Sequence, residues 1–250
     1  MVERVKAKPI ILNGRVRRRN TGGIAEVAAA VRIGIIGAGY IGGTLTRKLA
    51  ALGHDVYVAN SRSPETLDDL ARETGATAVW AADAATDADL VIVSIPQKNV
   101  VDLAPGIVDG RKSGAPVIET NNYYPQQRDG RIDAIESGLT ESEWVAGVIG
   151  APVHKVFNGI FWKHLLDKGV PGGTAGRIAL PVACPEAGKE LVLSLVDDLG
   201  FDPVDAGDLR ESWRQQPGTP VYGKDYDAAG VKAALAQATP ERPAEFRALP

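Results

Sequence analysis

Three glycines within six residues, at positions 37, 39 and 42, constrain the fold of this chain more than any other feature. The five residues before them, 32–36, have the length and apolar character of a buried parallel strand. After them, leucines at positions 45, 49 and 52 recur at helical spacing until Gly53. A strand, a glycine turn and a helix in this order predict a dinucleotide-binding unit.

Each glycine of the turn has its own physical role. The first permits a tight turn, the second lets the backbone approach a pyrophosphate, and the third lets the helix pack closely on the strand. The N-terminus of the helix then offers free N–H groups and the positive end of its dipole to the phosphates. We therefore expect the pyrophosphate to be held by Gly37, Ala38, Gly39, Tyr40, Ile41 and Gly42.

The end of the second predicted strand, residues 54–60, indicates which form of the cofactor is bound. An NAD enzyme places a carboxylate there, on the adenosine ribose, whereas this chain has Asn60, Ser61 and Arg62, beginning eighteen residues after Gly42. Asn60 and Ser61 can donate hydrogen bonds, and Arg62 can hold a phosphate in a bidentate fork. The segment favours NADP over NAD. Helix capping by the following serine and proline, residues 63 and 64, is an alternative role for this segment, and the two roles are compatible.

Composition sets limits on fold and location. With 250 residues and 44% hydrophobic content, the chain can bury a core in one domain, alone or with a small appendage. No apolar run approaches the length of a membrane span, so we expect no membrane function. The single cysteine, Cys184, excludes an internal disulfide framework and favours a reducing, cytoplasmic location. We interpret it as a core residue, and we assign no metal site.

Charge is distributed unevenly along the chain. Residues 1–20 contain seven Lys or Arg and one Glu, a net charge of +6 in a chain whose total is −3, so the remaining residues carry −9. A block of like charge is usually disordered, and we interpret residues 1–30 as a basic, disordered extension. Two alternatives are an address or nucleic-acid contact in this segment, and a true translation start near Val31. The acidic remainder argues against a nucleic-acid-binding body.

Strand and helix patterns alternate after residue 31, which predicts an α/β fold with a doubly wound parallel sheet of Rossmann type. Strands are expected near residues 78–80, 89–94, 116–121 and 153–158, and helices over residues 64–72, 81–88, 99–107, 140–149 and 161–168. Residues 177–183 and 201–205 read as strands on either side of a helix over 186–199. We expect a dinucleotide-binding domain over 31–158, a small C-terminal α/β lobe over 159–224 that completes a ligand crevice, and a helix and tail over 225–250.

Four short segments together resemble one known family. They are residues 35–42, 60–62, 94–96 and 155–158, and a later stretch, 199–209, resembles the same family's last strand and turn. The resemblance is to the NADP oxidoreductases typified by coenzyme F420-dependent NADP reductase, and it spans about residues 31–222. It implies a Rossmann-type fold, NADP(H) as the cofactor, and hydride transfer to or from the deazaflavin coenzyme F420.

The resemblance also implies roles for single residues. Ser61 and Arg62 would hold the 2′-phosphate, while Ser94, Ile95 and Pro96 would line the nicotinamide side. Asn158 would lie near the reacting rings, and we assign Asn121, Asn158 and Trp213 to the substrate. The chain departs from the family where Thr66 and Leu67 replace a second basic residue, which predicts a smaller preference for NADP over NAD. Asn121, Trp162 and Trp213 resemble a branch whose acceptors are unassigned.

Hydride transfer between two stacked flat rings needs proximity and orientation, and it needs no acid or base from the protein. We therefore predict an NADP(H)-dependent oxidoreductase with a flat small-molecule acceptor, and we assign no catalytic residue. A reductase of small C=O or C=N substrates would need a proton donor, for which the candidates are Tyr123, His154, Lys155 and His164. Relatives of that kind have a long helical C-terminal domain, whereas the residues after Asn158, about 90 in number, have a mixed pattern of strands and helices. A redox sensor that binds NADP without turnover is a third hypothesis, and the oligomeric state stays open, a homodimer included.

Overall fold

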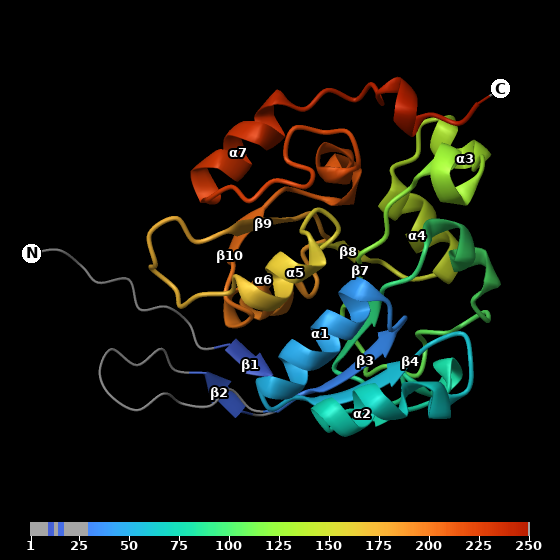
Figure 1. Ribbon diagram of the computed structural model, residues 1–250, viewed down its shortest axis with the longest axis vertical. Helices are drawn as coiled ribbons and strands as arrows, with labels where there is room; N and C mark the ends of the chain where they lie inside the picture. Colours follow the sequence, from blue (N-terminus) through green and yellow to red (C-terminus); the bar gives the residue numbers. More distant parts are fainter. Residues whose placement is uncertain (1–9, 13–14, 18–29, 250) are drawn as a thin grey trace, which may run out of the picture.

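A six-stranded parallel sheet forms the centre of the structure (Figure 1). The computed structural model describes residues 10–12, 15–17 and 30–249. In sheet order the strands are β5 (Thr77–Ala78), β4 (Asp55–Ala59), β3 (Arg32–Ile36), β6 (Leu90–Val93), β7 (Val117–Glu119) and β8 (His154–Lys155). The chain runs outward from β3 to one edge and then returns to β6, so the strand order reverses between β3 and β6. This is the doubly wound fold that the sequence predicts, and such folds bind ligands at that switch point.

One face of the sheet carries the largest apolar core. Ile33 and Ile35 of β3 point into it, and they pack against Leu45 and Leu49 of the first helix. The helices on this face are α1 (Tyr40–Ala51), α2 (Asp68–Thr74), α5 (Trp162–Asp167) and α6 (Lys189–Asp198). Helix α5 packs directly beside α1, as Figure 1 shows, although the two are far apart in sequence. The segment that follows β8 is thereby brought to the glycine turn.

The opposite face is covered by a second core. A 3₁₀ helix, Gln97–Asp102, and helix α4 (Glu141–Ile149) pack there, and α3 (Asp133–Glu136) precedes α4. The predicted capping box of α4 is confirmed, because the hydroxyl of Thr140 accepts a hydrogen bond from the amide of Glu143, 3.1 Å away. The carboxylate of Glu143 in turn accepts from the amide of Thr140 at 3.0 Å. These two bonds fix the start of α4.

A small second sheet forms the C-terminal lobe. Strands β9 (Ala179–Val182) and β10 (Asp202–Asp205) are parallel and are connected by α6, which confirms the predicted strand, helix, strand unit. The amide of Lys155 donates to the carbonyl of Ala183 at 2.8 Å, and the reverse bond is 3.1 Å. Helix α7 (Ala228–Gln237) covers the outer face of the lobe through Val231 and Leu235. The lobe is therefore attached to the edge of the main sheet at β8.

Several predicted elements are shorter than the sequence indicates. The helix expected over 99–107 is wrong, since the 3₁₀ helix ends at Asp102 and turns follow, where Pro105 disfavours helical backbone at the preceding residue. The helix expected over 81–88 is only a 3₁₀ turn, Ala81–Asp83. Its backbone packs directly on β3, because a Cβ built on Gly34 would meet the carbonyl oxygen of Ala84 at 2.0 Å. Strand β8, expected over 153–158, contains only two residues, and Phe157 after it has a φ of 64°.

The N-terminal segment is described only in part. Strands β1 (Ile10–Leu12) and β2 (Arg15–Arg17) form a short antiparallel pair. The other residues of the predicted basic extension lie outside the described part of the chain, so the prediction of disorder stays a prediction. Within the described part, none of the helices has the length and apolar character needed to cross a bilayer.

Candidate functional site

The glycine turn lies between the carboxyl end of β3 and the start of α1. Gly37 has a φ of 109°, and a Cβ built on it would lie 2.1 Å from the carbonyl oxygen of Ser94. A Cβ on Gly42 would lie 1.8 Å from the carbonyl oxygen of Gly37. Both clashes are with backbone, which cannot swing aside. The first glycine is therefore required by the turn, and the third by the close contact between helix and turn.

Gly39 differs from the other two glycines because a Cβ built on it would meet nothing within 4 Å. It is the N-cap of α1, and it has no side chain to satisfy the first amides of the helix. Gly37 and Gly42 hold the turn close to the sheet, while Gly39 faces open space beside free N–H groups. This arrangement is a cradle for an anion at the positive end of a twelve-residue helix. A pyrophosphate fits it.

In the loop after β4, the guanidinium of Arg62 is exposed, and the side chain of Asn60 holds the turn in place. The Oδ1 of Asn60 accepts from the amide of Arg62 at 2.8 Å, and its Nδ2 donates to the hydroxyl of Thr66 at 2.9 Å. The side chain of Asn60 therefore shapes the loop, and its contact with a cofactor stays a prediction. Ser61 and Arg62 are exposed, and among the described residues the guanidinium of Arg62 has no hydrogen-bonding or ionic partner. Ser63 stands at the predicted N-cap, but its side chain makes no capping bond.

The carboxyl ends of β6 and β7 are tied together beside the cradle. The hydroxyl of Thr120 donates to that of Ser94 at 2.9 Å, and the amide of Ile95 lies 3.4 Å from the Oδ1 of Asn121. Ser94, Ile95 and Pro96 are half-buried, and Pro96 is the N-cap of the following 3₁₀ helix. The structure thus places these three residues next to Asn121 at the switch point of the sheet, where the nicotinamide end of an extended dinucleotide would lie.

Asn121 is held by charged groups on both sides of its backbone. Its amide donates to the Oε2 of Glu119 at 2.8 Å, and its carbonyl accepts from the Nζ of Lys155 at 2.9 Å. The side chain is only 2% exposed, and its Nδ2 has no hydrogen-bond partner within the described structure. Buried donors rarely stay unpaired, so this one is available to a ligand that enters the edge of the sheet.

A chain of buried charges lies behind Asn121, and sequence reasoning missed it as a unit. The Nζ of Lys155 lies 3.1 Å from Glu119 and 3.6 Å from Glu141, and all three side chains are inaccessible to solvent. Arg242, from the C-terminal tail, donates to Glu141 at 3.1 Å. Desolvation raises the pKa of Glu141, and the charges of Lys155 and Arg242 oppose that shift. The sequence feature that could have predicted these buried charges is the presence of a glutamate and a lysine inside apolar strands, because charged residues are seldom buried unless they are paired.

The two remaining predicted substrate residues lie at the junction with the C-terminal lobe. The Nδ2 of Asn158 donates to the carbonyl of Gln215 at 2.7 Å and to Asn122 at 3.1 Å, and its Oδ1 accepts from Gln215. Asn158 is buried, and its amide is fully used in joining β8 to the lobe. Trp213 is half-buried on the neighbouring 3₁₀ helix, Leu209–Gln215, with the guanidinium of Arg214 at 4.4 Å from its ring. The substrate roles of both stay predictions.

The four proton-donor candidates of the sequence have structural partners. His154 is buried between the carbonyls of Val117 and Ala187, and desolvation lowers its pKa. Lys155 belongs to the buried charges, and His164 pairs with Asp225 at 2.8 Å. The hydroxyl of Tyr123 accepts from the amide of Ile132, and burial raises its pKa to about 12. Cys184 is also buried, which raises the pKa of its thiol to about 11 and suits a core residue.

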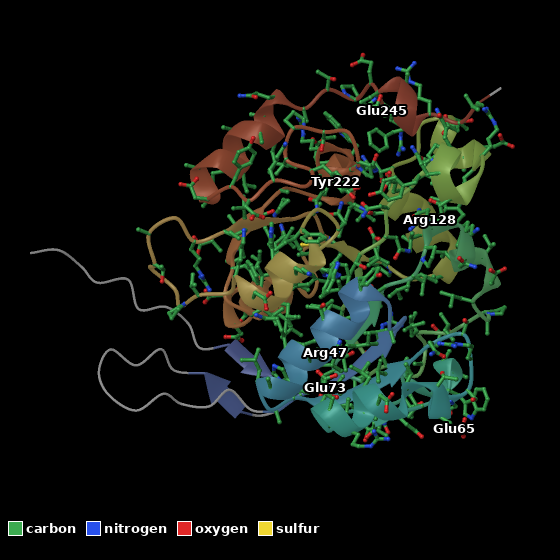
Figure 2. All side chains as sticks on the ribbon, viewed as in Figure 1. Arg47, Glu65, Glu73, Arg128, Tyr222 and Glu245 are labelled. Carbon is green, nitrogen blue, oxygen red and sulfur yellow. The ribbon has the colours of Figure 1, made fainter. Side chains whose placement is uncertain are left out.

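Two tyrosines, Tyr124 and Tyr222, connect the main sheet to the C-terminal lobe. The hydroxyls of Tyr124 and Tyr222 are hydrogen-bonded to each other, and Figure 2 labels Tyr222 in the lobe. The amide of Gly223 donates to the carbonyl of Gly159 at 2.9 Å, which places Tyr222 beside the carboxyl end of β8. Burial and the neighbouring Tyr124 hydroxyl raise the pKa of Tyr222, so the phenol stays protonated. The pair uses one of its two hydroxyl protons, and the other can be donated elsewhere.

Comparison with known proteins gives one family and several similar structures. Residues 32–123 match the family described as NADP oxidoreductase coenzyme F420-dependent. A stretch of 67 residues is 46% identical to the protein YjhV of Escherichia coli (strain K12), covering 26% of this chain and 49% of that protein. The match therefore spans about half the length of this curated relative.

Two solved structures resemble the larger part of this chain. The hypothetical protein SMa0349 from Sinorhizobium meliloti is 29% identical, with a TM-score of 0.65 over 78% of this chain and 94% of that one. A candidate F420-dependent NADP-reductase from Arthrobacter sp. FB24 is 22% identical, with a TM-score of 0.56 over 72% of this chain and 86% of that one. The second likeness establishes the fold alone.

Proposed function

We propose that the chain transfers a hydride between NADP(H) and a flat acceptor, the deazaflavin coenzyme F420 being the leading one. The match of residues 32–123 to the family described as NADP oxidoreductase coenzyme F420-dependent supports this proposal. The observation that carries the proposal is the open cradle at Gly39, where two backbone-locked glycines leave the helix amides facing empty space. The exposed guanidinium of Arg62, on a loop fixed by Asn60, supports recognition of the 2′-phosphate. A single cysteine and this cofactor suit a cytoplasmic enzyme.

The residues of the site would each do one thing in this reaction. The amides at the start of α1 would bind the pyrophosphate, and Arg62 would bind the 2′-phosphate. Ser94, Ile95 and Pro96 would line the nicotinamide ring at the end of β6, and Asn121 at the end of β7 would contact the acceptor. Bound NADPH would supply the hydride, and the acceptor would take it up together with a proton from solvent. Orientation carries the rate, so the protein needs no acid or base for a deazaflavin.

A stopped-flow experiment tests this proposal. NADPH is mixed with the protein and a panel of oxidised deazaflavins and flavins, and the reverse reaction is followed with NADP⁺ and the reduced acceptors. We expect the absorbance of NADPH to decay fastest with a deazaflavin. If NADPH binds but no member of the panel turns over, the hydride-transfer proposal is wrong and an NADP-binding sensor becomes the better description.

A second candidate is a reductase of small C=O or C=N substrates, and the tyrosine pair is the observation that favours it. Such a reaction needs a proton for the oxygen or nitrogen that receives the negative charge, and the free hydroxyl proton of Tyr124 or Tyr222 is a donor at the acceptor side of the site. Replacing Tyr222 by phenylalanine separates the two candidates. The change should slow a carbonyl or imine reduction by about 100-fold and leave deazaflavin reduction within about twofold.

A further inference from the structure

The residue after Gly39 carries the most exposed large aromatic ring among the described residues. Tyr40 is the first residue of α1, and it is 76% exposed. Its ring is stacked on that of Trp162, the first residue of α5, with the ring centres 5.1 Å apart and an angle of 16° between the planes. Tyr40 follows the interior strand β3 and Trp162 follows the edge strand β8, so the stack is a tertiary contact and does not follow from local sequence.

Neighbouring side chains fix the orientation of Trp162. Phe161 packs on it at 5.9 Å in a tilted arrangement, and Phe161 also meets the ring of His164 edge-on at 5.2 Å. The ammonium group of Lys163 lies 5.5 Å from the centre of the Trp162 ring. Trp162 is therefore held firmly, and it holds one face of Tyr40. The exposed area of Tyr40 must come from its remaining face and edges, which lie in water.

The stack of Tyr40 on Trp162 lies beside the open space at Gly39, where the cofactor is proposed to bind. The backbone of Tyr40 contributes one of the free amides of α1, and its side chain begins directly beside the open space at Gly39. Trp162 follows β8 at the carboxyl edge of the same sheet. Ligands of doubly wound sheets bind along this edge. Leaving a rigid aromatic face in water beside a ligand site is unfavourable for the stability of the fold. The same face provides a surface on which a ligand ring can stack.

We propose that the open face of Tyr40, backed by Trp162, is the surface on which the planar acceptor stacks. This inference rests on the proposed function, and it adds the ligand class and the residues that select it. An offset stack rewards a conjugated, flat ring system, whereas a small aliphatic carbonyl or imine gains little from it. The stack therefore favours a deazaflavin-like or flavin-like ring over a small substrate.

Substitutions at the two rings test the proposal by equilibrium binding. Calorimetric titration measures the Kd of a ring-only probe, 5-deazariboflavin, on protein saturated with NADP⁺. We expect Tyr40→Leu and Trp162→Ala each to raise this Kd by about 3- to 10-fold, and to raise the Kd of NADPH by less. Tyr40→Phe keeps the stack, and it should restore most of the affinity that Tyr40→Leu loses.

Trp80 offers a matched control. It is 56% exposed at the end of β5, on the far side of the sheet from β8, so Trp80→Ala removes a comparable indole without touching the stack. We expect the probe's Kd to be unchanged in this variant. Circular dichroism and unfolding in urea check that every variant is folded.

The outcomes separate this inference from the proposed function. A probe that binds equally well to wild type, Tyr40→Leu and Trp162→Ala overturns the stacking surface, even if hydride transfer is observed. A probe that binds through Tyr40 but receives no hydride supports the surface and overturns the proposed reaction. A probe that does not bind wild-type protein at all overturns the stacking surface, and the stopped-flow experiment with the wider panel then decides the reaction alone.

Discussion

The Nζ of Lys155 lies 3.1 Å from the Oε1 of Glu119, and neither side chain is accessible to solvent. Two charges removed from water are tolerated only when their remaining hydrogen-bonding groups are also satisfied. Here Ser142 donates to Glu119, and Lys155 donates to the carbonyl of Asn121. The ion pair thus connects the buried end of β7 to the edge of the sheet where the ligand is predicted to bind.

Removing one member of the pair should be strongly destabilising. Lys155→Met leaves Glu119 and Glu141 buried without their shared cation, and we expect the free energy of unfolding in urea to fall by about 3–5 kcal/mol. Arg47→Ala is the control, because Arg47 and Glu73 form a solvent-accessible pair at 2.7 Å (Figure 2), and exposed pairs contribute about 1 kcal/mol or less. Equal losses in the two variants would contradict this account.

Two glycines of the turn, Gly42 and Gly39, should respond differently to the same substitution. Gly42→Ala places a methyl group against the backbone of Gly37, and we expect a loss of at least about 2 kcal/mol in stability. Gly39→Ala meets no neighbour, so its stability should change by about 1 kcal/mol or less. The Kd of NADPH should nevertheless rise at least about 10-fold in Gly39→Ala, because the methyl group occupies the space of a phosphate. Thermal unfolding and fluorescence titration measure the two effects separately.

Arg62→Ala should discriminate between the two nicotinamide cofactors. A charge-assisted bond to the 2′-phosphate contributes about 1.5–3 kcal/mol, so we expect the Kd of NADPH to rise about 10- to 100-fold while that of NADH stays within about twofold. Asn60→Ala removes the bond that holds the amide of Arg62, and it should weaken NADPH binding by a smaller factor. Equal losses for NADPH and NADH in Arg62→Ala would exclude the 2′-phosphate role.

The sequence predicts the parts of the fold whose signals are local. The turn at Gly37, the capping box at Thr140 and the apolar strand Leu90–Val93 each depend on a few adjacent residues, and all are present as predicted. The helix predicted over 99–107 is wrong because Pro105 disfavours helical backbone at the residue before it. Local propensity is a weak guide where tertiary contacts decide.

The parts that sequence reasoning missed depend on contacts between distant residues. Arg242 reaches Glu141 across a separation of 101 residues, and the stack of Tyr40 on Trp162 requires β8 and α5 to return beside α1. The sequence did not predict that Asn60 holds its own loop through hydrogen bonds at both ends of its side-chain amide, and its contact with a cofactor stays a prediction. Side-chain partners across the fold cannot be inferred from spacing along the chain.

Stability should depend on pH through His154. The ring is buried, and its two nitrogens lie 3.2 Å and 2.9 Å from the carbonyls of Val117 and Ala187. Desolvation, the largest cause, lowers its pKa below the usual 6.5, the two carbonyls oppose the shift, and the positive charge of Lys189 adds to it. The imidazole of His154 therefore binds a proton more readily in the unfolded chain than in the folded protein. The resulting stabilisation is fully present above about pH 6.5 and is lost as the pH falls from there towards the folded pKa.

Urea unfolding across this range measures the effect. The free energy of unfolding of the wild type should fall below about pH 6.5 with a slope of at most about 1.4 kcal/mol per pH unit from this group. The variant His154→Asn retains a hydrogen-bond donor, but its side chain does not titrate. The difference in the free energy of unfolding between wild type and variant should therefore shrink as the pH is lowered. His164→Asn is the control, because His164 is partly exposed and pairs with Asp225. A constant difference between wild type and His154→Asn from about pH 8 to about pH 5 would show that His154 titrates alike in the folded and unfolded chains, and burial would then not govern its pKa.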